Sequence, residues 1–232
     1  MRSIIITGAS SGIGRATAEL FLSRGWRVGL IARRRSLLEE IAAGQERAVV
    51  LPADVTDAAA MQAGFAAFGR LDVLFNNAGL FGPSAPIDEV ALEDWAQVLS
   101  VNLNGMFIAA RLAFAAMRAQ GSGGRIINNG SISAHAPRPG SVCYTTSKHA
   151  ITGLTKSLSL DGRPFDIACG QIDIGNAESP LVAELKAANP GMDTMDVAHA
   201  AASVLHMAEL PLSANVQFMT VMATKMPFVG RG

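Results

Sequence analysis

The sequence predicts a doubly wound α/β fold, in which a parallel sheet is covered by helices on both faces. Two observations lead to this fold class. Short apolar runs alternate with helical patterns from one end of the 232-residue chain to the other, as expected of repeated strand–helix units. Half of the residues are hydrophobic and only 16% are charged, so a large core can be buried. We therefore expect residues 1–232 to form one domain.

The apolar runs predict about seven strands separated by helices. Short apolar runs of this kind are typical of buried parallel strands. The strands are expected at residues 3–7, 27–32, 48–52, 71–75, 125–129, 165–173 and 216–221. The helices are expected to begin at residue 13 and to recur at 58–68, 92–100, 103–120, 142–160 and 196–208.

Charge and cysteine content exclude several classes of partner. Lys+Arg and Asp+Glu number 19 each, so the basic surface of a nucleic-acid-binding protein is missing. The chain enters an apolar strand directly after Met1 and Arg2, and we see no run of membrane-spanning length; we expect a cytoplasmic protein with no membrane partner. Cys143 and Cys169 lack metal spacing, so no metal is expected, and both are interpreted as small core residues rather than reactive thiols.

A glycine-rich turn follows the first strand and opens the first helix. Gly8, Gly12 and Gly14 are spaced G-x-x-x-G-x-G. Glycines let the backbone approach a pyrophosphate closely, and the helix N-terminus supplies free N–H groups. The turn therefore predicts a dinucleotide site.

The end of the second strand indicates which dinucleotide. In this position an acid takes a ribose hydroxyl, whereas an arginine suits a 2′-phosphate. The sequence offers Arg33, Arg34 and Arg35, and the first acid is Glu39. We expect NADP(H) in preference to NAD(H); the alternative is a solvated basic turn at a helix start.

Tyr144 and Lys148 are the candidate catalytic pair. Four residues apart on a helix, they share one face. An ammonium beside a phenol favours the phenolate, which brings tyrosine towards the working range of an acid/base catalyst. Ser131 follows an apolar run that ends in glycine, and catalytic groups of open α/β sheets gather at such carboxyl ends.

Taken in order, these motifs resemble the short-chain dehydrogenases/reductases, in their short single-domain branch. The resemblance covers about residues 3 to 222 and implies a Rossmann fold. The motifs are TGASSGIG at 7–14, Asp54-Val55, NNAG at 76–79, Asn102, Ser131, and Tyr144 with Lys148.

The resemblance implies a role for each catalytic residue. Tyr144 would exchange a proton with the substrate oxygen, and Ser131 would hydrogen-bond that oxygen. Lys148 would hold the nicotinamide ribose, and Asn102 would hold a water that links Lys148 to solvent. The substrate would be a small carbonyl compound or alcohol. The alternative is a catalytically inactive member of the family that binds NADP(H) as a sensor or scaffold.

The resemblance also implies the cofactor contacts. They come from the glycine turn, the basic residues, the ends of the third, fourth and sixth strands, and the catalytic pair. The residues are Gly8, Ser10, Ser11, Gly12, Ile13, Gly14, Arg33, Arg34, Asp54, Val55, Asn77, Ala78, Gly79, Tyr144, Lys148, Gly170 and Ile172.

Two departures from the family pattern concern the substrate end. Where the family has Pro-Gly-x-Val-x-Thr, this chain has Cys169 in place of the proline and Ile174 in place of the threonine. The residues 223–232 replace the usual short ending. This tail either covers the site, here or in a neighbouring subunit, or is a solvated end.

Two further segments carry expectations. The helices at 103–120 and 142–160 are expected to pack against a second subunit in a homodimer or homotetramer; burial against the chain's own sheet is the alternative. The segment 174–195, broken by two prolines, is expected to be a lid. Its apolar side chains would face the cleft and its charged ones solvent; a fixed surface helix is the alternative. The residues concerned are Pro180, Leu181, Val182, Glu184, Leu185, Lys186 and Pro190.

Overall fold

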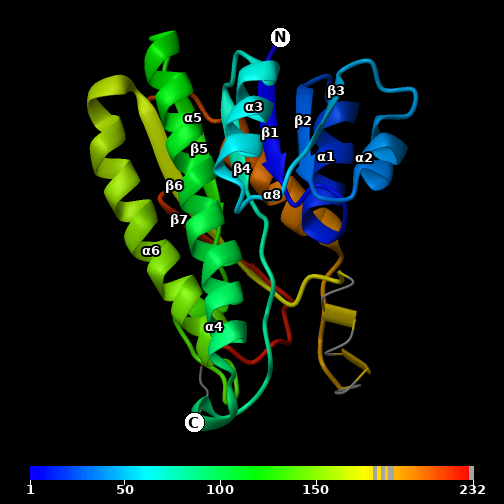
Figure 1. The fold of residues 1–232 in the computed structure, drawn as a ribbon, viewed down its shortest axis with the longest axis vertical. Helices are drawn as coiled ribbons and strands as arrows, with labels where there is room; N and C mark the ends of the chain where they lie inside the picture. The colour runs from blue at the N-terminus through cyan, green and yellow to red at the C-terminus, as the bar shows by residue number, and fades with distance from the viewer. Residues whose placement is uncertain (180–181, 184–185, 188–190, 230–232) are drawn as a thin grey trace.

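A seven-stranded, all-parallel sheet forms the centre of the protein (Figure 1). This computed structural model describes residues 1–179, 182–183, 186–187 and 191–229. The strand order is β3-β2-β1-β4-β5-β6-β7. The strands are β1 (Ser3–Thr7), β2 (Arg27–Ala32), β3 (Ala48–Pro52), β4 (Val73–Asn76), β5 (Gly124–Asn129), β6 (Ile167–Gly175) and β7 (Phe218–Met222).

The strand β1 carries a run of three isoleucines because both faces of the sheet are covered. In β1, Ile4 and Ile6 face one hydrophobic cluster and Ile5 faces the other, since successive side chains of a strand point to opposite faces. All three are fully buried. The expected fold class is therefore confirmed.

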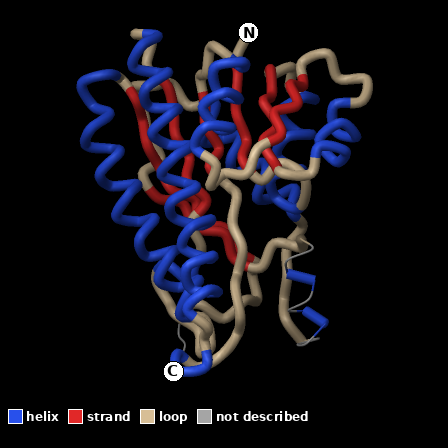
Figure 2. Tube along the Cα trace, viewed as in Figure 1, coloured by secondary structure: helices blue, strands red, loops and turns tan. Residues whose placement is uncertain are grey.

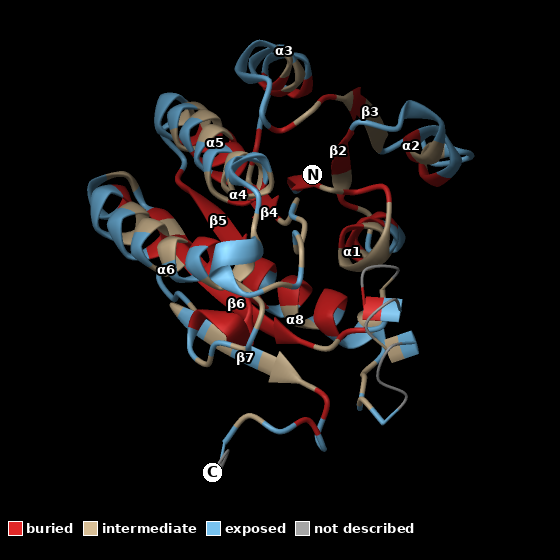
Figure 3. Ribbon diagram, turned by 60° about the horizontal axis from the view of Figure 1, so that its bottom comes forward, coloured by how far each residue is buried: buried red, intermediate tan, exposed pale blue. Residues whose placement is uncertain are grey.

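Within the described part of the chain, helices cover both faces of the sheet (Figure 2). On one face lie α1 (Gly12–Ser23), α2 (Arg35–Ala42) and α8 (Val197–Glu209), and on the other lie α3 (Ala58–Phe68), α5 (Met106–Gln120) and α6 (Val142–Gly162). In Figure 3 the buried residues of these helices lie on the sides turned towards the sheet.

The helices α4 (Leu92–Leu99) and α5 are joined by a π-helical stretch, η2 (Ser100–Gly105). Together they form one helix of 29 residues, Leu92–Gln120, whose length and hydropathy alone would let it cross a membrane. Our expectation of no such run is therefore wrong by composition. Core helices of soluble proteins pass the same test, and here Ala109, Ala113 and Met117 pack against the sheet.

Several boundaries differ from the sequence expectations. The helix α2 was not expected. The sixth strand starts at Ile167 because Arg163–Phe165 forms the 3-10 turn η4 around Pro164. The other short helical turns are η1 (Ile87–Glu89) and η3 (Ile132–Ala134).

The strand order places a crevice at the carboxyl edge of the sheet. Going outward from the centre, the chain winds one way from β1 to β3 and the other way from β4 to β7. Connections therefore leave in opposite directions between β1 and β4, which is where open α/β sheets bind ligands. In Figure 1 the N-terminal end of α6, the described residues that follow β6 and the described residues that follow β7 extend beyond this edge.

Candidate active site

A cavity of about 730 Å³ opens at this edge, and most of the sequence-predicted site residues line it. Lining residues come from the turns after β1, β2, β3 and β4, from the end of β5, and from the start of α6. The predicted residues in its wall are Gly8, Ser10, Ser11, Gly12, Ile13, Arg33, Arg34, Asp54, Val55, Asn77, Ala78, Gly79, Ser131, Tyr144 and Lys148. Gly14, Asn102, Gly170 and Ile172 lie behind the wall or elsewhere.

The glycine turn is shaped by a very close backbone approach. A Cβ atom on Gly14 would lie 2.2 Å from the backbone carbonyl oxygen of Gly8, and Gly8 itself has a φ of +68°. A side chain at Gly14 would force the first turn of α1 away from β1, and one at Gly8 would press on Asn77 and Ala78 in the turn after β4. Ser11 is the N-cap of α1 and makes no side-chain capping hydrogen bond. First-turn N–H groups of α1 are thus available to an anion at this point.

Two arginines flank the cavity beyond β2. The Arg34 guanidinium donates a hydrogen bond to the Ser10 hydroxyl at 3.2 Å. Arg33 is largely exposed and lies 4.0 Å from the Asp54 carboxylate. Hydrogen bonding from Thr56 is the main cause that lowers the pKa of Asp54, so this carboxylate is ionised and turned partly towards its own turn.

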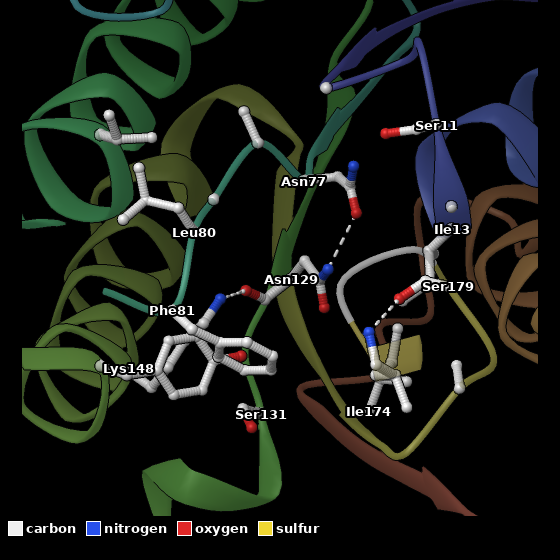
Figure 4. Close-up of a pocket in the computed structure, with 18 of the residues that line it drawn as sticks. Ser11, Ile13, Asn77, Leu80, Phe81, Asn129, Ser131, Lys148, Ile174 and Ser179 are labelled. Atoms are coloured by element: carbon white, nitrogen blue, oxygen red, sulfur yellow. Dashed lines mark hydrogen bonds between the residues drawn. The ribbon is translucent and has the colours of Figure 1, made fainter. Parts of the chain in front are cut away.

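The polar ends of β1, β4 and β5 brace one another (Figure 4). The Asn77 side chain donates to the Thr7 carbonyl at 3.0 Å and accepts from the Asn129 amide at 2.9 Å. The Thr7 hydroxyl accepts from the backbone N–H groups of Asn77 and Ala78. These bonds fix the floor of the cavity.

Lys148 reaches that floor from α6. Its ammonium donates to the backbone carbonyl of Asn129 at 2.7 Å (Figure 4). The side chain is almost fully buried, and this desolvation lowers the pKa of Lys148 to about 8, against a smaller opposing effect of the Asp173 charge.

Tyr144 does not behave as the spacing argument expects. Its pKa is raised, not lowered, because burial is the largest cause; the hydrogen bond with Ser131 and the charge of Arg138 oppose this, and Asp173 adds to it. The Lys148 ammonium lies 5.4 Å from the centre of the tyrosine ring, but its proton donation is directed at Asn129. The phenol is therefore held in its protonated form at neutral pH.

Asn102 sits in the π-helical stretch and supports the cavity from behind. Its side-chain oxygen accepts from the Leu80 N–H at 2.9 Å, and its amide donates to the Leu80 carbonyl and to the Ser147 hydroxyl. π-Helical bulges are frequent at functional sites. Here the bulge directs a fully buried amide towards the loop after β4 and the middle of α6.

The two β6 residues that were expected to contact the cofactor do not border the cavity. Gly170 lies against the Val216 carbonyl and Ile172 is in the core, so neither borders the cavity. Residues 174–177, which follow them, do. Between the two sets lies Asp173, fully buried, which accepts from the Ser131 N–H at 2.9 Å and contacts the His135 ring at 2.7 Å.

Two expectations concern the cavity wall: that the tail covers the site, and that the segment 174–195 is a lid. Met226 from the tail lines the cavity and packs with Ile132, so the described part of the tail covers this side of the site. Ser179 and Val182 line it from the expected lid, and Val182 is buried. The other expected lid positions at 180–181, 184–185 and 190 fall outside the described residues.

The residues present fit a dinucleotide. The glycine turn and α1 offer N–H groups to phosphates, two arginines stand at the adenosine end, and Lys148 stands at the other. Asn129 borders the cavity, and its buried side-chain oxygen has no hydrogen-bond partner among the described residues. Such an unsatisfied acceptor is unfavourable unless a ligand or water donates to it.

Sequence reasoning did not single out the lining residues Phe81, Asn129 and Arg138, and it placed Met226 only within a tail that either covers the site or is a solvated end. Asn129 could have been found as the polar residue that closes the fifth strand. Arg138 is a charged residue inside the loop that precedes α6, but no spacing rule singles it out. Phe81 and Met226 reach the site only through the course of their loops.

Comparison with known proteins adds three findings. The family model described as short chain dehydrogenase matches residues 2–190. The chain is 36% identical to a 3beta-hydroxysteroid dehydrogenase of Mediterraneibacter gnavus, over 77% of this chain and 67% of the relative. It is 38% identical to the 2-(R)-hydroxypropyl-CoM dehydrogenase of Xanthobacter autotrophicus, over 78% and 76%.

Solved structures resemble the whole chain. Levodione reductase matches with a TM-score of 0.88 at 26% identity, over 95% of this chain and 96% of that one. A closed form of serine dehydrogenase complexed with NADP+ matches with a TM-score of 0.93, over 99% and 98%. At 21% identity this second likeness concerns the fold alone.

Proposed function

Because this chain belongs to the short-chain dehydrogenase/reductase family, we propose that it interconverts a carbonyl compound and its alcohol with NADP(H). The observation that carries the proposal is the joint placement of Ser131, Tyr144 and Lys148 in one cavity with the glycine turn. The whole of residues 1–232 is proposed to act as one domain that holds both cofactor and substrate.

Tyr144 and Ser131 are proposed to act on the substrate oxygen. Reduction of a carbonyl group places negative charge on that oxygen, and preset hydroxyl donors stabilise such charge best in a water-poor site. The raised pKa of Tyr144 keeps its proton in place until the oxygen becomes basic. Tyr144 is thus suited to donate a proton in the direction of reduction.

The chain's other residues hold and orient the cofactor, which when bound supplies or accepts the hydride. We assign the pyrophosphate to the turn from Gly8 to Gly14 and the adenosine side to Asp54, Val55 and the residues from Asn77 to Gly79. Lys148 would bind the nicotinamide ribose. Its hydrogen bond to the Asn129 carbonyl fixes the ammonium on the cavity floor.

The proposed preference for NADP(H) is supported by the two arginines beyond β2. Arg33 makes only a 4.0 Å ion pair with Asp54 and Arg34 one hydrogen bond to Ser10, so both retain donors for a phosphate. Hydrogen bonds to charged groups contribute roughly 1.5–3 kcal/mol. Fluorescence titration should therefore give a dissociation constant for NADPH at least about tenfold below that for NADH.

A matched pair of variants tests this assignment. Arg33→Asp should abolish most of the preference, whereas Arg35→Asp, which alters an arginine paired with Glu39 outside the cavity wall, should preserve it. Equal affinity of the unmutated protein for both cofactors would refute the NADP(H) assignment.

The activity itself is tested with a panel of ketones and aldehydes, by following the absorbance of NADPH. Tyr144→Phe should lower turnover about 100-fold or more, because general acid catalysis is lost, while the affinity for NADPH stays within about twofold. Thr146→Val, an exposed position on the same helix, is the control and should keep full turnover.

Two results would count against the proposal. Near-normal turnover of Tyr144→Phe would remove this residue from the mechanism. Tight binding of NADPH without turnover of any carbonyl compound would instead identify a sensor or scaffold. A cytoplasmic location is proposed with the enzyme, and recovery of the native protein in a membrane or secreted fraction would contradict it.

A further inference from the structure

We infer that the substrate carries a carboxylate and that Arg138 binds it. This inference rests on the proposed function, since it names the class of carbonyl substrate that the same site would accept. A keto acid or hydroxy acid fits the arrangement described below.

Arg138 is held beside the catalytic tyrosine by its loop. Its backbone carbonyl accepts from the Ser141 hydroxyl at 2.7 Å, and the neighbouring Gly140 carbonyl accepts from the Ala85 N–H at 3.2 Å. The loop is therefore tied both to the start of α6 and to the loop after β4. The half-buried side chain of Arg138 borders the cavity.

Phe81 links the guanidinium to the reacting end of the site. The guanidinium carbon lies 5.9 Å from the centre of the Phe81 ring, and that ring packs edge-on against Tyr144 with 4.6 Å between ring centres. The positive charge of Arg138 is near enough to oppose the rise in the pKa of Tyr144. One small molecule can therefore reach both groups.

The guanidinium of Arg138 has no polar partner among the residues that the structure describes. It makes no ion pair within 4.0 Å and no hydrogen bond there. The buried Arg125 is the contrast, because its guanidinium donates to Asn215 and to three backbone carbonyls. The guanidinium carries five N–H donors, and on a residue that borders the cavity these are free to bind an acceptor that the ligand supplies.

The charges around the cavity favour an anion at this end. Charged residues in the wall are Arg33, Arg34, Asp54, Arg138 and Lys148. The first three lie at the ends of β2 and β3, so the catalytic end has two cations and no lining carboxylate within the described chain. Asp173 lies behind the wall, where the Ser131 N–H, Gln171 and His135 already occupy its oxygens.

The shape of the group follows from the chemistry of arginine. A planar guanidinium matches a carboxylate in a bidentate pair, which a neutral carbonyl or hydroxyl cannot replace. Phe81, Val182 and Met226 supply apolar wall. We therefore expect a short aliphatic or aromatic keto acid whose carbonyl group lies at Tyr144 and Ser131 while its carboxylate lies at Arg138.

The test compares acids with their methyl esters. At pH 7, kcat/KM is measured with NADPH for 3-oxobutanoate, 4-oxopentanoate and 5-oxohexanoate and for the matching esters. The unmutated protein should prefer at least one acid over its ester by about tenfold or more. Arg138→Met should lower this acid-to-ester ratio about 10- to 100-fold, mainly through the KM of the acid.

Two further variants sharpen the result. Arg138→Lys keeps the charge but not the planar fork, so it should restore only part of the ratio. Arg47→Met removes an exposed arginine outside the cavity wall and should leave the ratio unchanged. A ratio rather than a rate is compared, so that partial loss of folded protein does not affect the outcome.

Binding is measured separately from turnover, by fluorescence titration of the NADP+-saturated protein with 4-oxopentanoate and with its ester. One outcome is that acids and esters are turned over alike and that Arg138→Met leaves the acid-to-ester ratio of kcat/KM unchanged. This outcome would overturn the inference but not the proposed function. Absence of turnover with every compound would remove the proposed function. In that case, loss of acid binding in Arg138→Met would still support the anion site, and unchanged or absent acid binding would overturn it.

Discussion

Lys148 carries its charge into a part of the protein from which water is nearly excluded. Its folded-state pKa of about 8 lies below the ordinary value of 10.5 because of burial. The folded protein therefore loses this proton at a lower pH than the unfolded chain does. Stability rises with pH wherever the unfolded state binds more protons, so the contribution of Lys148 is fully present above about pH 10.5 and is lost as the pH falls from there to about 8.

This linkage predicts a pH-dependent difference between two proteins. Between pH 8 and pH 10, Lys148 should add about 2 kcal/mol to the free energy of unfolding. Burial raises the pKa of Cys169 to about 12, which acts in the opposite direction, so the net slope of one protein is not diagnostic. The free energy of unfolding should instead be measured with urea for the unmutated protein and for Lys148→Met. From pH 8 to pH 10, the value for the unmutated protein should rise by about 2 kcal/mol relative to that for Lys148→Met.

The control for that measurement is Lys156→Met, on the exposed side of the same helix. Its stability should run parallel to that of the unmutated protein from pH 8 to pH 10. A constant difference between the unmutated protein and Lys148→Met at every pH would contradict the depressed pKa.

At the scale of single residues, the sequence predicted which residues form the site better than it predicted their pKa values. The positions of Ser131, Tyr144 and Lys148 follow from helical spacing and a strand end. The direction of the Tyr144 pKa shift does not, because desolvation depends on side chains brought in by other elements, such as the Phe81 ring. Asn129, whose backbone carbonyl accepts a hydrogen bond from the Lys148 ammonium, was missed although it is the polar residue that closes the fifth strand.

At the scale of elements, predictions were best where a strand or helix is long and apolar. The first strand, residues 3–7, and the third helix, residues 58–68, have the expected limits. The bulge at Ser100–Gly105 could not be foreseen, because it satisfies hydrogen bonds to Leu80 that exist only in the folded chain. Helix α2 spans only eight residues, and its buried face rests on Leu38 and Ile41, so its amphipathic pattern is too short to distinguish it from a turn.

The segment after β6 is the element whose behaviour we predict. Its two ends are joined by backbone hydrogen bonds. The Glu178 N–H donates to the Met195 carbonyl at 2.8 Å, and the Met195 N–H donates to the Asn176 carbonyl at 3.0 Å. Between them, Val182 faces the cavity and Lys186 pairs with Glu178 at 2.7 Å on the outside. Such an arrangement permits a lid that closes over bound cofactor and excludes water.

Limited digestion with trypsin tests the lid. Cleavage after Lys186 should be rapid in the free protein and slowed about tenfold or more by saturating NADPH, since cleavage needs local opening. Cleavage after the exposed Arg47 should be unaffected and serves as the internal standard. The same rate after Lys186 with and without cofactor would indicate a helix fixed permanently to the core.

At the scale of the whole molecule, the fold class followed from the alternation of strands and helices. Association with other copies of the chain gives a weaker signal in the sequence. The helices α5 and α6 lie side by side on one face of the sheet (Figures 1 and 3). Ala109 and Met117 of α5 pack against that sheet, so burial within the chain accounts for part of its apolar surface. Phe107 and Leu160 remain 53% and 57% exposed.

We propose that these outer sides meet in a homodimer or homotetramer, because large apolar side chains exposed on neighbouring helices mark association surfaces. Light scattering at micromolar concentration should give two or four times the chain mass of 24.2 kDa. Phe107→Glu should shift the mass towards a single chain, since a buried unpaired charge strongly disfavours association. Leu212→Glu, which places a charge at another exposed apolar residue in the loop after α8, should keep the assembly. A single-chain mass for the unmutated protein would mean that the apolar surface of α5 and α6 is exposed to solvent and does not mediate self-association.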